Sequence, residues 1–302
     1  MHVFLFPIRS ERTCSASVKE PRRIALPQTK WLLPILVLAM FCRSVSAEET
    51  DMTPLSDKLM IRGGWAYVFG VHSAFSYSSP NTGVGTTIDF SKTLGGDTST
   101  NAFRIDTLYR FNERHAMGFS YYRVGLSGQS QLNEQIQIED KTINAGAFTN
   151  TSINLNFYRL IYNYSFYHSG KVELGVSPGL YMVNTRFSLA AEGTINNLPS
   201  ASTSVNERVT VPLPSIGFLV NYKITPKLEW QNRFDLFYLA VGQYRGSMLE
   251  FYSGLEYRFF EHVAVGAAYD RLSIGLENTS KNGYTIDVNY NLTYVYATLY
   301  FF

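Results

Sequence analysis

Cysteine, charge and long apolar runs are all scarce in this 302-residue sequence. Both cysteines, Cys14 and Cys42, come before residue 48, so the rest of the chain can form neither a disulfide framework nor a thiolate metal site. Charged residues make up only 17%, whereas about a quarter is usual in soluble domains. The strongest apolar run, WLLPILVLAMF, is shorter than the about 20 residues that a membrane-spanning helix needs. These absences argue against a disulfide-stabilised protein and a helical membrane protein.

The first 47 residues have the organisation of a signal peptide. Basic residues precede the apolar run, and Val45, Ser46 and Ala47 form a small-residue cleavage site after it. We therefore predict export and cleavage after Ala47, which leaves a mature chain without cysteine. A lipoprotein anchored at Cys42 is disfavoured because bulky side chains precede that residue.

The leader also explains the basic character of the whole chain. It carries seven of the 26 basic residues but only two of the 24 acidic ones, so the remainder has 19 basic and 22 acidic residues. The mature protein is slightly acidic, and we expect no nucleic-acid partner.

After residue 58 the sequence alternates between large apolar and polar side chains, which is the periodicity of strands. In 227–238 the apolar parity holds Leu228, Trp230, Phe234, Leu236 and Tyr238. The polar parity holds Glu229, Gln231, Arg233 and Asp235. Ten such segments are expected, at 59–76, 102–112, 115–126, 152–167, 171–188, 209–223, 227–242, 248–260, 262–275 and 284–302.

The connections and the side-chain pattern favour a membrane barrel over a β-sandwich. Short turns alternate with long loops rich in Ser, Thr, Asn and Gly, near 77–101, 127–151 and 189–208. Charges lie in the middle of strands, and aromatic residues crowd near strand ends, as in the girdles of transmembrane barrels. We predict an all-β fold: a closed antiparallel up-and-down transmembrane β-barrel of about ten strands, with eight to twelve compatible with the pattern. Residues 1–47 are the signal peptide, 48–58 a periplasmic segment and 59–302 the barrel; the QIQIED stretch within 127–151 could add a hairpin above the membrane.

The last segment, YTIDVNYNLTYVYATLYFF, is the most aromatic of the ten. Its even positions are expected to form a lipid-facing row that closes the barrel against the first strand: Tyr284, Ile286, Val288, Tyr290, Leu292, Tyr294, Tyr296, Thr298, Tyr300 and Phe302. Its odd positions would then face the lumen, from Thr285 and Asp287 onward.

One hairpin is repeated within the chain. YRFNERHAMGFSYYR at 109–123 and YRFFEHVAVGAAYDR at 257–271 align without a gap and share eight of fifteen residues. Arg110 and Arg258 are expected in the lumen, with flanking aromatic residues at the membrane interface. Arg123 and Arg271 fall on the outward parity at the upper edge of the apolar band, where they either contact lipid phosphates or extend into water.

The predicted lumen carries charges of both signs. They are Arg62, Arg104, Asp106, Arg110, Arg159, Glu173, Glu229, Arg233, Asp235, Glu256, Arg258 and Asp287. About ten strands leave little more room than side chains fill, so these groups are expected to pair across the interior and to plug or gate it.

The histidines offer little support for catalysis. His115, His168 and His262 fall at short turns, whereas His72 lies on the predicted lumen parity, where it could act as a general base. No motif supplies it with a nucleophile or an acidic partner. We predict no enzymatic activity, no catalytic residues, no metal and no cofactor.

The mature chain resembles Gram-negative outer-membrane β-barrels in its cysteine-free composition, alternating strands and short turns. The stretch IDFSKTLGGDTSTNAFRIDTLYRFNERHAMGFSYYR is similar to the first loop and second hairpin of small OmpW-like and OmpA-like barrels. The resemblance implies an outer-membrane location, with outer-membrane lipid and lipopolysaccharide as surroundings. It also implies insertion by the outer-membrane assembly machinery, which would read Tyr294, Tyr296, Tyr300 and Phe302 as an assembly signal.

Three functions are compatible with these observations. The leading hypothesis is a structural barrel or a narrow channel for small solutes. The alternative is surface adhesion or recognition of an extracellular ligand, of unknown identity, through the long loops. A lipid-modifying enzyme at the rim, built around His72, is the third.

Overall fold

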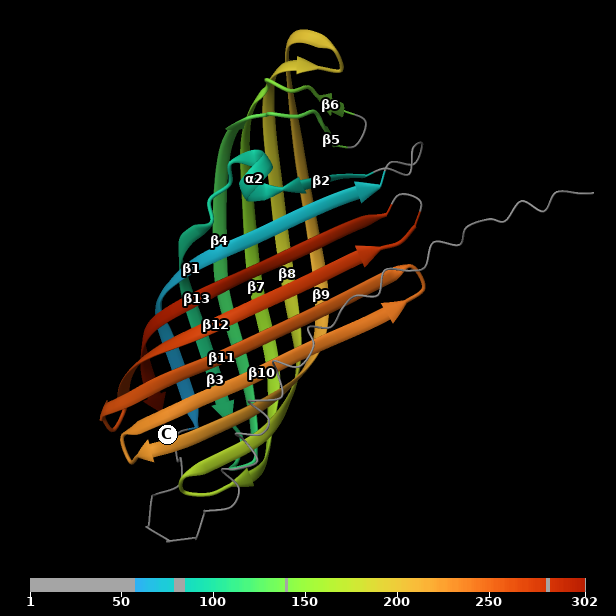
Figure 1. Ribbon diagram of the computed structural model, residues 1–302. Coiled ribbons are helices and arrows are strands. Elements are labelled where there is room, and N and C mark those ends of the chain that lie inside the picture. The colour runs from blue at the N-terminus through green and yellow to red at the C-terminus, as the bar shows by residue number, and fades with distance from the viewer. Residues whose placement is uncertain (1–57, 79–84, 139–140, 281–282, 302) are drawn as a thin grey trace, which may run out of the picture. The chain divides into compact units, whose positions relative to one another are not determined.

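The computed structural model describes residues 58–78, 85–138, 141–280 and 283–301, almost all of them in antiparallel strands (Figure 1). The predicted signal peptide, nearly all of the segment 48–58, and Phe302 lie outside the described residues. No helix in the described part of the chain is long and apolar enough to cross a membrane.

The strands close into a ring. In chain order the elements are β1 (Leu59–Ser78), β2 (Gly85–Asp89), α2 (Phe90–Leu94), β3 (Ser99–Arg110), β4 (His115–Gln131), β5 (Ile136–Ile138), β6 (Lys141–Ile143), β7 (Phe148–His168), β8 (Val172–Ile195), β9 (Leu198–Thr225), β10 (Leu228–Val241), β11 (Tyr244–Phe260), β12 (Val263–Asn278) and β13 (Tyr284–Phe301). The ring follows β1, β3, β4, β7, β8, β9, β10, β11, β12 and β13, and β13 pairs back with β1. The prediction of a closed antiparallel barrel of about ten strands is confirmed.

The closing pair contains an irregularity that changes which side chains face inward. β1 pairs with β13 from Leu59–Phe301 to Tyr77–Tyr284, and the register shifts between Phe69 and His72. Gly70 adopts φ 60° at this β-bulge, a conformation that glycine adopts without steric cost. A one-residue shift exchanges the two faces of a strand. Beyond the bulge Val71 is therefore buried, and His72 turns outward.

The long-loop end of the barrel is more ordered than expected. The segment 189–208 is mostly strand: β8 and β9 continue into a tight hairpin in which Asn196 and Asn197 adopt φ of 50° and 62°. Asparagine tolerates this left-handed region, so the two residues suit a two-residue hairpin turn. Within 127–151 the QIQIED stretch contributes to the small β5–β6 hairpin, as suggested from the sequence.

A short helix in the first long loop joins this ordered region. The Asp89 side chain caps α2 by accepting hydrogen bonds from the amides of Ser91 and Lys92, and Gly95 ends the helix at φ 62°. Phe90 and Leu94 on the helix belong to a buried apolar cluster that also includes side chains of β4, β5, β6 and β7. The described parts of the long loops therefore pack together over one end of the barrel.

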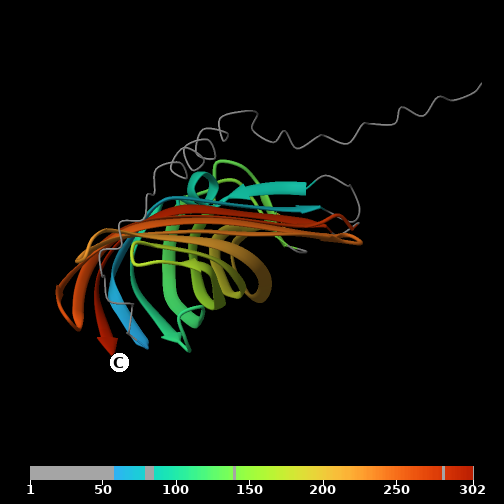
Figure 2. The same cartoon turned by 90° about the horizontal axis from the view of Figure 1, so that it is seen from below.

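The ring is interrupted on one side, toward the long-loop end of the barrel. β9 pairs with β10 only from Thr225–Leu228 to Ile216–Leu236, after which it pairs with β8 alone (Figure 1). Pro212 and Pro214 lie within the stretch of β9 that does not pair with β10, and they have no amide hydrogen to donate to a neighbour. In Figure 2 the orange and red strands lie over the green and yellow strands.

Candidate functional site in the barrel lumen

Alternation along the strands gathers the charges into the lumen. Of the twelve lumen charges predicted from the sequence, all except Asp287 lie on the inward parity of their strands. Arg62 on β1 is directly opposite Asp106 on β3, and Asp235 on β10 is directly opposite Glu250 on β11. Charges that are far apart in sequence therefore meet because neighbouring strands are in register.

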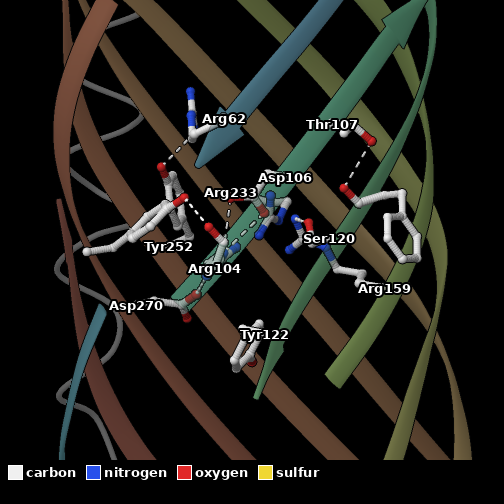
Figure 3. A network of polar contacts seen from close by, with 12 residues as sticks. Arg62, Arg104, Asp106, Thr107, Ser120, Tyr122, Arg159, Arg233, Tyr252 and Asp270 are labelled. Carbon is white, nitrogen blue, oxygen red and sulfur yellow. Dashed lines mark hydrogen bonds and ion pairs between the residues drawn. The ribbon is translucent and has the colours of Figure 1, made fainter. Parts of the chain in front are cut away.

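Arg104 lies at the centre of this network (Figure 3). Its Nε donates to both carboxylate oxygens of Asp106 at 3.1 Å, and its Nη1 donates to Asp270 Oδ2 at 2.7 Å. The guanidinium carbon lies 5.3 Å and 5.4 Å from the ring centroids of Tyr122 and Tyr294. Only 1% of Arg104 is exposed, so both ion pairs are shielded from bulk solvent. Charge-assisted hydrogen bonds and aromatic faces together hold this cation in the interior.

A second group lies beside it, around Arg159 and Arg233. Arg159 Nη1 donates to Tyr181 Oη at 3.2 Å and to Glu250 Oε2 at 3.4 Å. Arg233 Nε donates to Asp235 Oδ2 at 2.7 Å. Two neighbouring carboxylates are thus matched by two arginines, as buried charges require.

Two further groups lie toward the short turns. Arg62 Nη2 donates to Glu256 Oε2 at 2.7 Å, and Glu256 also accepts hydrogen bonds from Thr298 and Tyr300. In the second of these two groups, Arg110 Nη1 on β3 donates to Glu173 Oε1 on β8 at 2.9 Å. The polar interior therefore continues from the middle of the barrel almost to the end that carries the short turns.

Between these groups lies a cavity of about 120 Å³. Its lining includes Arg62, Arg104, Asp106, Arg159 and Arg233. A water molecule occupies about 30 Å³ in the liquid, so this space suits a few waters. The cavity does not amount to an open passage of porin size.

The repeated hairpin predicted from the sequence is confirmed. The β3–β4 and β11–β12 turns carry equivalent aromatic pairs on the outer face: Tyr109 with Phe111, and Tyr257 with Phe259, at 5.1 Å and 4.7 Å between ring centroids. Arg258, the counterpart of Arg110, lies with its guanidinium carbon 3.9 Å from the ring centroid of Tyr300.

Sequence reasoning missed part of the network. Glu250 and Asp270 are buried members that the predicted set omits, although both lie on the polar parity of their strands. Asp270 directly precedes Arg271, so the outward assignment of Arg271 already placed Asp270 inside. The buried tyrosines of the lumen were also missed: Tyr122, Tyr181, Tyr252, Tyr290, Tyr294, Tyr296 and Tyr300.

The predicted orientation of the last strand is wrong. Tyr294 is 0% exposed and Tyr300 forms a hydrogen bond to Glu256, whereas Val295 is 66% exposed on the outer face. The even row of β13, including Tyr296, therefore faces the lumen, and the odd row faces outward. Tyrosine suits this interior because its ring fills space while its hydroxyl reaches a buried polar partner.

Two other predicted lumen residues lie outside it: the bulge in β1 turns His72 outward, and Asp287 belongs to the outward-facing odd row of β13. The His72 side chain is 51% exposed, with Nδ1 3.7 Å from Asp89 Oδ2. Asp287 lies near the same rim, directly opposite Ala74 on β1. The lumen position that motivated the enzyme hypothesis is therefore incorrect. Within the described ranges, no group of three or more His, Cys, Asp or Glu side chains could hold a metal ion.

The remaining candidates lie largely where the sequence placed them. Arg123 on β4 and Arg271 on β12 both face outward and are exposed. His115 lies at a short turn against Tyr162, and His168 Nδ1 lies 3.8 Å from Glu173 Oε1.

Known structures share this architecture. No protein-family model matches the sequence, and no curated protein sequence matches it. The crystal structure of the outer membrane protease OmpT from Escherichia coli matches with a TM-score of 0.51 and 13% sequence identity, covering 84% of this chain and 99% of that one. The chain has the fold of an outer-membrane β-barrel.

Two other solved structures are similar at lower TM-scores. The Pseudomonas putida toluene transporter TodX matches with a TM-score of 0.34 and 8% identity, covering 81% of this chain and 90% of that one. The outer membrane protein OprG from Pseudomonas aeruginosa matches with a TM-score of 0.28 and 13% identity, covering 81% of this chain and 96% of that one.

Proposed function

We propose that the protein is an integral outer-membrane barrel with a structural role, whose lumen is closed by its own side chains. The observation that carries the proposal is the Arg104 network, in which a buried arginine joins β3 to β12 across the interior through Asp270. Similar links join Arg62 on β1 to Glu256 on β11, and Arg159 on β7 to Glu250. Such cross-links tie distant strands of the ring together while occupying the space that a solute would need.

The outer surface supports a location in the membrane. Large apolar side chains are exposed on many strands of the ring, among them Trp65, Phe103, Leu255 and Val295. In water such a surface would be unfavourable, whereas in hydrocarbon it is the expected exterior of a barrel with a polar interior. The described fold therefore supports an outer-membrane location, with the short turns on the periplasmic side.

Conductance in planar lipid bilayers tests the closed lumen. The wild-type barrel should give no stepwise current, because paired charged side chains span the lumen. The double variant Arg104→Ala/Arg159→Ala should give small, stepwise currents by removing two arginines that line the cavity. Arg271→Gln, on the outer face, is the matched control and should stay silent. Steady stepwise current through the wild-type protein would instead establish the narrow channel considered from the sequence.

Surface recognition is a second candidate, favoured by the ordered β8–β9 extension. β9 pairs with β8 from Tyr222 up to Leu198, far beyond the end of its pairing with β10. At this end of the molecule Phe148 and Leu198 are among the most exposed apolar side chains. A rigid platform with exposed apolar groups binds with little loss of conformational entropy.

The role of the β8–β9 extension is tested by measuring how fast cells that display the protein aggregate and settle. Phe148→Ser/Leu198→Ser should slow self-aggregation of the cells, while Tyr238→Ser at another part of the rim should not. If Phe148→Ser/Leu198→Ser and Tyr238→Ser cells settled at the same rate, this second role would be contradicted.

A further inference from the structure

Three arginines lie close together on the outer face of β4, β8 and β9. The pairing registers place the outward residues of neighbouring strands in rows. One row is wholly apolar or aromatic: Tyr121, Tyr158, Met182 and Pro212. The next row holds Arg123, Asn156, Asn184 and Thr210. The row after that holds Gly125, Asn154, Arg186 and Arg208. The surface thus changes from apolar to cationic within two rows, about 14 Å along the strands.

This change marks the upper edge of the apolar band. Below it, the outward side chains Phe119, Leu160 and Leu180 continue the apolar surface toward the short turns. The arginines therefore lie at the height of the lipid headgroups in the outer leaflet if the barrel spans the membrane as proposed above.

Among the side chains that the structure describes, no acidic group pairs with these arginines. Arg186 and Arg208 are directly opposite each other in the β8–β9 ladder, and both are exposed. Among the residues that the structure describes, neither has an ion pair or a side-chain hydrogen bond. Like charges in directly opposite positions destabilise a ladder. An anion bound between the two guanidinium groups would offset this repulsion.

The surrounding polar side chains complete the arrangement. Arg123 Nη2 donates to Asn154 Oδ1 at 2.6 Å, and this bond directs Arg123 toward the row that contains Arg186. Asn184 Nδ2 donates to Thr210 Oγ1 at 2.8 Å between the two rows. Adjacent strands are about 4.8 Å apart, so the three arginine backbones lie within roughly 15 Å of one another. Arginine side chains can converge on a phosphorylated headgroup over that distance.

We propose that Arg123, Arg186 and Arg208 bind the phosphate groups of an anionic lipid headgroup in the outer leaflet, of the lipid A kind. The guanidinium fork matches phosphate oxygens in a bidentate manner, while the apolar row beneath receives the acyl chains. The proposal rests on the membrane location proposed above. It extends the contact expected of Arg123 to a three-residue site and separates it from Arg271, which lies on the far side of the ring.

Binding is tested on the full barrel in detergent micelles by native mass spectrometry with diphosphoryl lipid A. Arg186→Gln and Arg208→Gln should each weaken binding about tenfold, since a charged hydrogen bond of this kind contributes at least one power of ten. Arg271→Gln should leave binding unchanged. Fully dephosphorylated lipid A should bind the wild type and the two variants, Arg186→Gln and Arg208→Gln, with the same low affinity. Equal effects of Arg271→Gln and Arg186→Gln would overturn the site, as would retained affinity for the dephosphorylated lipid.

The change in melting temperature caused by Arg186→Gln distinguishes lipid binding from a structural role, because its sign should reverse when lipid A is added. In neutral detergent, Arg186→Gln should raise the melting temperature because it removes a like-charge pair. With diphosphoryl lipid A present, the same variant should melt below the wild type. A lower melting temperature under both conditions would assign Arg186 a structural role and refute the proposal. Stabilisation by inorganic phosphate alone, equal to that by the lipid, would refute a lipid site.

Insertion is measured separately, by the heat-modifiable mobility of the folded barrel in vesicles. Variants that insert normally but lose lipid A binding would support the site. Failure of the wild type to insert would contradict the proposed membrane function instead.

Discussion

Replacing Arg104 by Met should destabilise the barrel more than any other single change to the lumen. Among the described residues, only Arg104 donates a hydrogen bond to the Asp270 carboxylate, at 2.7 Å. The other carboxylate oxygen of Asp270 is buried and has no hydrogen-bond partner there. Asp106 is less dependent on Arg104, because Arg62 is directly opposite it on β1. Removing one partner of a buried ion pair costs about 3–5 kcal/mol, and we expect a loss in this range, chiefly from Asp270.

A double-mutant cycle makes the reasoning specific. Asp270→Asn in the Arg104→Met background should recover about 1–2 kcal/mol, because it removes a buried, unpaired charge. Asp106→Asn in the same background should recover less. The assay is equilibrium urea unfolding in lipid vesicles, followed by the fluorescence of Trp65 and Trp230. A loss below about 1 kcal/mol for Arg104→Met, or equal recovery by the two second substitutions, would refute this account of the network.

Two further predictions concern strand orientation and the interrupted pairing. Tyr300→Phe should cost about 1.5–3 kcal/mol in the same unfolding assay, since it removes a hydrogen bond to buried Glu256, whereas Tyr257→Phe on the outer face should cost almost nothing. If Tyr300→Phe left the free energy of unfolding unchanged, the even row of β13 would face the lipid and not the lumen. Pro212→Thr/Pro214→Thr should promote barrel dimers in cross-linking, because the substitutions restore amide donors along the unpaired edge of β9. Unchanged cross-linking would mean that another feature protects that edge.

Most inward positions could be read from the sequence because charges do not face lipid. Arg104, Arg159 and Glu256 are each flanked along their strands by large apolar residues, so only one of the two parities could be polar. The repeated hairpin was predictable for the same reason. The pairing partners were not, because they depend on which strands lie opposite each other across the lumen.

The last strand shows where parity reasoning fails. Both rows of β13 are largely apolar between Leu292 and Phe301, so composition alone did not distinguish lipid from lumen. The tyrosine row lies inside because its hydroxyls meet buried groups such as Glu256 and the backbone oxygen of Arg104. These partners come from β11 and β3, and nothing local to β13 indicates them.

The amino-acid sequence by itself determined the export signal expected at 1–47, the ten alternating segments and the inward direction of most charges, because a period of two is a local property of each strand. Only the tertiary structure decided the effects of single-residue shifts and of cross-lumen contacts. The bulge at Gly70 moved His72 out of the lumen, and the register of β8 with β9 brought Arg186 opposite Arg208. Both depend on how one strand aligns with another, and the alignment is set by the packing of the whole ring.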